Sequence, residues 1–233
     1  MPRLIIMIIT VFNFFIYSQN NDLMDTSNRI REYISLTTMK IEKNSPIIKI
    51  DKIEGEDIII VKGNIYNTNI DNSTGKVIDD IRGKVILFGD VINNYNMNVQ
   101  MKFLGANIDL EGAGWFGFVI RAQDCDNYGV VWFMPGGAEG NNNIAYIPVA
   151  HGVIPWWTES YLKQEKGSFP LPKNDWFEAE IIVNKDEFSV FVNGTFIFKK
   201  KLTYYLLSGR PGLFIGTATD VMFRKIQIKD LDN

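Results

Sequence analysis

Cysteine and histidine are nearly absent from this sequence of 233 residues, which contains one of each. A single cysteine cannot form an internal disulfide, so the stability of the fold must come from its core. Cys125 lies between Asp124 and Asp126, whose negative charges disfavour the thiolate that a catalytic cysteine requires. A catalytic triad or a histidine-rich zinc site would have to use the single histidine, His151. The scarcity of both residue types therefore argues against thiol catalysis and against sites built from several histidines.

An excess of positive charge is also missing. The formal net charge is −3 and the isoelectric point is about 5.3, so the chain lacks the basic footprint of a nucleic-acid-binding protein. The partners expected from this composition therefore do not include nucleic acid.

Long apolar runs are limited to one segment near the N-terminus. Residues 4–17 follow Arg3 and precede Ser18, and a run of this length is too short to span a bilayer comfortably. A basic start, an apolar stretch and a small residue are typical of a secretory signal peptide, which we assign to residues 1–18. The alternative is an uncleaved membrane anchor. We expect a secreted, periplasmic or extracellular protein with no integral membrane segment in the mature chain.

Residues 176–201 give the clearest structural signal. Segments 177–183 and 188–192 alternate apolar and polar residues, and Asn193-Gly194 connects the second segment to 195–199. Asn-Gly is a strong hairpin signal, because both central residues of a type I′ turn require a positive φ. Three consecutive antiparallel strands are therefore predicted here, and we expect Trp176, at the start of the first, to be structural.

The rest of the chain repeats this pattern and shows no convincing amphipathic helix. The other strand-like runs are 33–41, 46–53, 57–61, 76–81, 84–88, 96–104, 115–121, 128–134, 143–150, 212–217 and 221–229. About a dozen short strands predict an all-β fold: a two-sheet antiparallel β-sandwich or jelly roll. We expect residues 19–32 to be a linker or short helix and residues 33–233 to form one domain.

A set of motifs in the second half of the chain points to a known superfamily. They are Gly117-Phe118 and Arg121 on one strand, Asp124, Asn127 and Tyr128 in the following turn and strand, Trp176, Val192-Asn193-Gly194, Gly209, Gly212-Leu213, Phe223 and Ile226. Their order resembles the concanavalin A-like lectin/glucanase superfamily in its laminin G-like branch, and more distantly the 3-keto-disaccharide hydrolase family. The resemblance implies a concanavalin A-like sandwich with carbohydrate as the ligand class.

The acidic motif of the enzymes with this fold is missing. Family 16 glycoside hydrolases carry E-x-D-x-x-E on one strand, and the nearest match, Glu178-Ala179-Glu180, lacks the third acid. Trp115-Phe116-Gly117 stands where the 3-keto-disaccharide hydrolases have Asn-Ser-Gly. We therefore favour a lectin-like protein that binds carbohydrate without catalysis. Two alternatives remain open: a glycoside or 3-keto-glycoside hydrolase, and a cell-surface adhesion module that binds protein.

Adjacent loop tryptophans suggest where the sugar would bind. Trp156 and Trp157 lie in a long connection with Tyr161, and flat aromatic side chains match the apolar faces of sugars. The alternative is that this loop folds back onto the sheet. At the same rim we expect polar contacts from Arg121, Asp124, Asn127 and His151.

The same turn offers a weak metal site. Asp124 and Asp126 could hold Ca²⁺, which prefers several oxygen ligands. An Asx turn between two strands is the alternative explanation of these residues. No other cofactor is expected.

Overall fold

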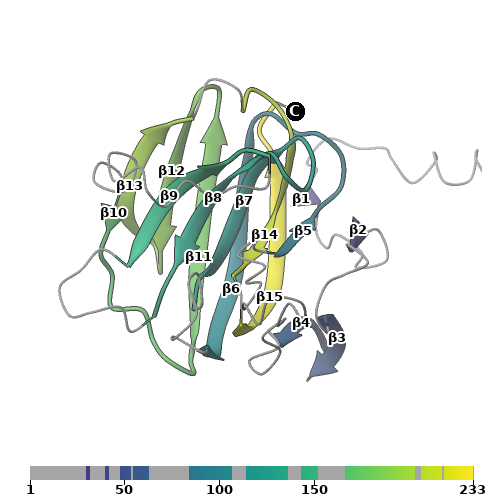
Figure 1. The fold of residues 1–233 in the computed structure, drawn as a ribbon, viewed down its shortest axis with the longest axis vertical. Coiled ribbons are helices and arrows are strands. Elements are labelled where there is room, and N and C mark those ends of the chain that lie inside the picture. The colour runs from purple at the N-terminus through teal and green to yellow at the C-terminus, as the bar shows by residue number, and fades with distance from the viewer. Residues whose placement is uncertain are drawn as a thin grey trace, which may run out of the picture.

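Two antiparallel sheets form the protein, which confirms the predicted all-β sandwich (Figure 1). The computed structural model describes residues 30–31, 40–41, 48–53, 55–62, 84–106, 114–135, 143–151, 166–202, 206–216 and 218–232. Within these ranges there is no helix, and so none that could cross a membrane. The predicted signal peptide at residues 1–18 and the predicted strand at 76–81 lie outside the described residues.

Sheet A contains eight strands in the order β13-β12-β11-β6-β15-β4-β3, with β1 beside β15. Their bounds are β1 Ile30–Arg31, β3 Ile48–Ile53, β4 Glu56–Lys62, β6 Tyr95–Ala106, β11 Trp176–Asn184, β12 Glu187–Val192, β13 Thr195–Lys201 and β15 Thr219–Asp230. Strand β1 belongs to the segment 19–32 that was expected to be a linker or helix, and it pairs with Ile228 and Lys229.

Sheet B contains seven strands in the order β10-β9-β8-β7-β14-β5-β2. Their bounds are β2 Lys40–Ile41, β5 Lys84–Leu87, β7 Phe116–Ala122, β8 Tyr128–Phe133, β9 Ile144–Val149, β10 Lys166–Gly167 and β14 Arg210–Ile215. Figure 1 shows β10 and β13 on one side of the molecule and β3 and β4 on the other.

The hairpin around Asn193-Gly194 has the predicted geometry. Strands β11, β12 and β13 are neighbours in sheet A, and Val192 pairs with Thr195 across the two-residue turn. Asn193 has a φ of 47° and Gly194 a φ of 75°, so both central residues adopt the positive values of a type I′ turn. The local sequence is therefore sufficient to set this turn.

Replacing Gly194 by Val should destabilise the fold by about 1–2 kcal/mol, because a β-branched residue resists a positive φ. A Cβ at Gly194 would meet no atom within 4 Å, so the cost comes from the backbone conformation alone. Chemical denaturation measures the change. Gly194→Asn is the matched control, because Asn tolerates this conformation and should cost much less. Equal stability of the Val variant and the native protein would contradict the turn assignment.

The main core lies between the two sheets. Along the first half of β6 every second residue faces it, and Tyr95, Met97, Val99 and Met101 are fully buried. Phenylalanine rings fill the centre, with ring centroids 5.7 Å apart between Phe133 and Phe177. This alternation leaves the other residues of β6 on the side of sheet A that faces away from the core, called the outer face below.

The central strands of sheet B, β7, β8 and β9, are buried on both faces. Val119 and Val130 pair across β7 and β8 and belong to a second apolar cluster, separate from the core-facing Phe118 and Val131. Trp132 joins this cluster and is 5% exposed. By contrast, β6, β11 and β12 alternate buried and more exposed residues. Of the two sheets, sheet A is therefore the one whose outer face presents polar side chains to a hydrophilic ligand.

Candidate functional site

The outer face of sheet A carries a ladder of amides and carboxylates on its two central strands. On β6, Asn96 and Asn98 alternate with the buried methionine and valine residues. On the neighbouring β11, Glu178 and Glu180 point the same way, because they alternate with the buried Ala179. This side-chain placement follows from the two-residue period of a strand.

Hydrogen bonds join the two strands side chain to side chain. Asn96 Nδ2 donates to Glu180 Oε1 at 2.7 Å, and Asn98 Nδ2 donates to Glu178 Oε1 at 2.8 Å. These bonds orient both carboxylates. An amide has two donor hydrogens and an acceptor oxygen, and a carboxylate has two acceptor oxygens, so one bond between them leaves polar capacity on both groups. The ladder is thus a preorganised row of donors and acceptors.

An aromatic ring and a guanidinium lie at one end of this ladder. Trp176, at the start of β11, is half-buried, and the Arg224 guanidinium carbon lies 4.2 Å from its ring centroid. Arg224 Nε also donates to Gln100 Oε1 at 2.8 Å, and its Nη1 lies 3.5 Å from Glu56 Oε2. The Arg224 side chain of β15 therefore contacts residues of three other strands, β11, β6 and β4. Its positive charge lies against the Trp176 ring and orients it. Trp176 was expected to be structural, yet it lies on the outer face.

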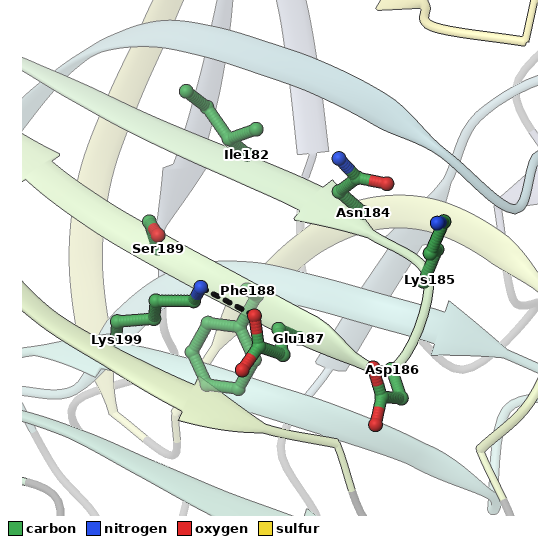
Figure 2. A pocket seen from close by; sticks show the side chains of 8 residues that line it. All are labelled: Ile182, Asn184, Lys185, Asp186, Glu187, Phe188, Ser189 and Lys199. Carbon is green, nitrogen blue, oxygen red and sulfur yellow. Dashed lines mark ion pairs between the residues drawn. The ribbon is translucent and has the colours of Figure 1, made fainter.

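A shallow hollow of about 250 Å³ lies at the other end of the ladder (Figure 2). It is lined by Ile182 and Asn184 of β11, Ser189 of β12 and Lys199 of β13. Glu187 of β12 forms an ion pair with Lys199 on the adjacent strand β13. The turn between β11 and β12 closes one end. Apolar, hydroxyl, amide and charged groups therefore converge within one small concave space.

Arg121, one of the predicted ligand contacts, is 2% exposed and faces the protein interior. Its Nη1 donates to the backbone carbonyls of Leu206 and Leu207 at 3.2 and 2.8 Å. Its Nη2 donates to the carbonyl of Asn93 at 2.8 Å and to that of Lys185. The guanidinium therefore links three chain segments that are distant in sequence, which is a structural role.

Asp124, Asn127 and His151, also predicted as ligand contacts, lie together and are joined by hydrogen bonds. Asn127 Nδ2 donates to both Asp124 carboxylate oxygens at 2.9 Å, and Asn127 Oδ1 accepts from the His151 backbone N–H at 3.1 Å. Asp124 Oδ1 also accepts from the backbone N–H of Asp126 at 2.7 Å, which forms an Asx turn. Burial by itself would raise the pKa of Asp124, but these hydrogen bonds outweigh it and lower the pKa.

The remaining predicted contacts, Trp156, Trp157 and Tyr161, lie outside the described residues. Across the part of the chain that is described, no group of three or more acidic, histidine or cysteine side chains could hold a metal ion. The Ca²⁺ site at Asp124 and Asp126 thus remains a prediction.

The outer-face site was not identified from the sequence. Its signal is present in residues 95–101, where amides alternate with buried apolar residues on a long strand. Amides at three successive outward positions, Asn96, Asn98 and Gln100, differ from the charged residues typical of a solvated strand face. Their proximity to Glu178 and Trp176 depends on strand pairing between distant segments, which the sequence pattern does not give.

Comparisons with known proteins agree on the architecture. No protein-family model matches the chain, and no curated protein matches it in sequence. The fold is similar to a carbohydrate-binding module, CBM66, from Bacillus subtilis, with 10% identity and a TM-score of 0.51 over 80% of this chain and 97% of the module. It is also similar to a Bacillus subtilis protein of unknown function with a galectin-like fold, with 9% identity and a TM-score of 0.53 over 87% and 94% of the two chains.

At these identities the likeness establishes the fold alone. The chain shares with these neighbours a β-sandwich of two antiparallel sheets. Neither neighbour assigns a ligand to it.

Proposed function

We propose that this protein is a secreted, lectin-like β-sandwich that binds carbohydrate without catalysis, and that the sugar lies on the outer face of sheet A beside Trp176. The observation that supports this most directly is the oriented ladder of Asn98–Glu178 and Asn96–Glu180 bonds next to a half-buried tryptophan. The fold neighbour CBM66, described as a carbohydrate-binding module, supports the ligand class.

The chemistry of this surface matches that of a sugar. Hydroxyl groups both donate and accept, so they pair well with amides and carboxylates that are already fixed in position. The C–H face of a sugar ring is apolar and packs against an aromatic ring such as Trp176. Ligand sites combine these two features: a few placed polar groups and an apolar surface.

Hydrolysis is less well supported than binding. Glu178 and Glu180 are two carboxylates on one strand face, as a glycosidase would require. A general acid at neutral pH, however, needs an apolar surrounding that keeps it protonated. Glu178 is exposed, and each carboxylate instead accepts a hydrogen bond from an asparagine. Glu178 therefore lacks the apolar surrounding of a general acid, and the fixed amide–carboxylate pairs support recognition of a ligand over proton transfer.

Protein recognition is also less well supported. The centre of a protein–protein interface is depleted in charged residues. The middle of the outer face instead carries Glu178, Glu180 and Arg224. Placement in the laminin G-like branch, and Ca²⁺ at Asp124 and Asp126, remain part of the proposal and need separate tests.

Trp176→Ala should weaken glycan binding about tenfold or more, which corresponds to about 1.4 kcal/mol. Loss of the stacking surface is the physical reason. The measurement is a glycan-array screen of the mature protein, with and without chelator, followed by titration of the strongest neutral glycan. Trp176→Phe keeps an aromatic ring and should retain most of the affinity. The chelator arm tests Ca²⁺ dependence in the same experiment.

The loop tryptophans provide the competing location. If the rim binds sugar as the sequence predicted, Trp156→Ala or Trp157→Ala should weaken binding while the melting temperature stays nearly unchanged. Full binding by the Trp176 variant, together with loss in either loop variant, would move the site from the outer face to the rim. A fall in stability of about 3–5 kcal/mol for the loop variants would instead identify these tryptophans as core residues.

A further inference from the structure

We propose that the hollow at the end of β11 is a second sugar subsite, so that the ligand is an extended, neutral oligosaccharide. This inference rests on the proposed function, because it assumes that the outer face binds sugar. It adds the length and the charge class of the ligand, neither of which the fold or its neighbours assign.

The distance between the two ends of the site sets the length of the oligosaccharide that would occupy both. Trp176 and Asn184 are eight residues apart on one strand, which corresponds to about 26 Å at about 3.3 Å per residue. An even separation places both side chains on the same face. A single sugar ring cannot reach both, whereas a chain of several rings can. Between Trp176 and the hollow lies the Asn–Glu ladder, so the intervening rings would meet fixed donors and acceptors.

The charges lining the hollow set the ligand class. Two lysines, Lys185 and Lys199, and two acids, Asp186 and Glu187, line it, so their formal charges cancel. Lys199 and Glu187 form an ion pair with each other, as Figure 2 shows. A sulfate or uronate would gain from a lysine but would lie beside a carboxylate. A neutral ring can instead accept from the ammonium and donate to the carboxylate without disturbing the pair.

The shape of the hollow suits one ring. It has a volume of about 250 Å³, with the apolar Ile182 side chain beside the polar Ser189 and Asn184. Figure 2 shows these side chains coming from adjacent strands, with the Lys199–Glu187 pair at one side. A ring seated here would place C–H groups against Ile182 and hydroxyls toward the polar wall.

The test uses the full-length mature protein and an array of neutral, uronate and sulfated oligosaccharides in length series from one to seven units. Native affinity should rise with chain length in the neutral series and should change little with salt, because neutral ligands are not screened. Ser189→Phe fills the hollow and should weaken the binding of long oligosaccharides about tenfold, while the binding of short oligosaccharides stays unchanged. Ser189→Ala keeps the hollow open and removes one hydroxyl of its polar wall, so it should weaken binding of long chains much less than Ser189→Phe does.

Thr195→Phe adds the same bulk on exposed β13, outside the hollow, and controls for added apolar surface. Asn184→Tyr fills the same space from the exposed end of β11 and replaces Ser189→Phe if circular dichroism shows that the latter does not fold.

The possible outcomes separate the two proposals. Binding that is independent of chain length, or unaffected by both filling variants, would overturn the second subsite while leaving sugar binding intact. Preference for sulfated or uronate chains with a steep salt dependence would overturn the neutral class. Failure of every glycan to bind would overturn the proposed function itself.

Discussion

Replacing Arg121 by Met should lower the free energy of unfolding by about 3–5 kcal/mol, the largest loss we expect from any substitution of a polar residue in this protein. The guanidinium of the native residue satisfies four backbone carbonyls, those of Asn93, Lys185, Leu206 and Leu207. Methionine has a similar length but no donor, so these part-buried acceptors would lose their partner. The three chain segments that meet at this end of the sandwich would then keep packing and a few other hydrogen bonds, such as that from Ile92 N–H to the Gly209 carbonyl oxygen at 3.2 Å.

Arg121→Lys is the matched control. Lysine keeps the positive charge but donates from a single nitrogen, so it cannot reproduce the planar fork that reaches four carbonyls. We expect an intermediate loss, about half of that in the Met variant. Urea denaturation of both variants measures the difference. A Met variant within about 1 kcal/mol of the native protein would show that the four hydrogen bonds contribute little.

The charge of Arg121 should not limit this role near neutral pH. Burial lowers the pKa of the guanidinium, and the nearby acids Asp186 and Asp232 oppose the shift. Arginine begins from a pKa so high that it stays protonated under these conditions. The Met and Lys variants should therefore show the same difference in stability at any pH around neutrality.

Glycan titration of the folded Met variant gives a second result. The sequence placed Arg121 among the ligand contacts because it stands in a lectin-like motif. The structure places its side chain 2% exposed and bonded to the chain itself. Unchanged glycan affinity, measured well below the unfolding transition, would confirm a purely structural role. Loss of affinity in a variant that remains folded would support the ligand contact instead.

Features that depend on neighbouring residues were predictable from the sequence. Alternation alone marked the strand that became β6, and the Asn193-Gly194 turn set the first pairs of β12 with β13, up to the register shift between Val190 and Phe191. The Asx turn at Asp124 was anticipated for the same reason, since an aspartate carboxylate accepts from backbone groups two residues away. Each of these features is decided within a few residues.

Features that depend on strand order were not predictable. Strand β6 lies between β11 and β15, so Asn98 contacts a glutamate that is 80 residues away. A two-residue period states which side chains share a face but not which strand lies beside another. The hydrogen-bond partners of Arg121 were not predictable for the same reason, because they are between 28 and 86 residues away in sequence. The candidate site therefore became visible only with the sheet order.

Replacing Gly209 by Ala should cost about 2–5 kcal/mol, the sum of a backbone cost and a steric cost. Gly209 has a φ of 154°, which side-chain-bearing residues rarely adopt. A Cβ there would lie 2.3 Å from the backbone carbon of Arg121 and 2.6 Å from the carbonyl oxygen of Ala122. Backbone atoms of a central strand cannot move aside easily, so β14 and the loop before it would shift. Thermal and urea denaturation measure the loss.

Gly55→Ala separates the two contributions, because Gly55 also has a positive φ of 82° but no atom within 4 Å of an added Cβ. It should cost only about 1–2 kcal/mol. The double variant of Gly209→Ala and Arg121→Met should lose less than the two single losses combined, since both act on the same junction between β7 and the segment before β14. Strictly additive losses would mean that the arginine and the glycine stabilise this end of the sandwich independently. A coupling of about 1 kcal/mol or more would show that the close approach at Gly209 is what lets the Arg121 side chain reach the carbonyls of Leu206 and Leu207.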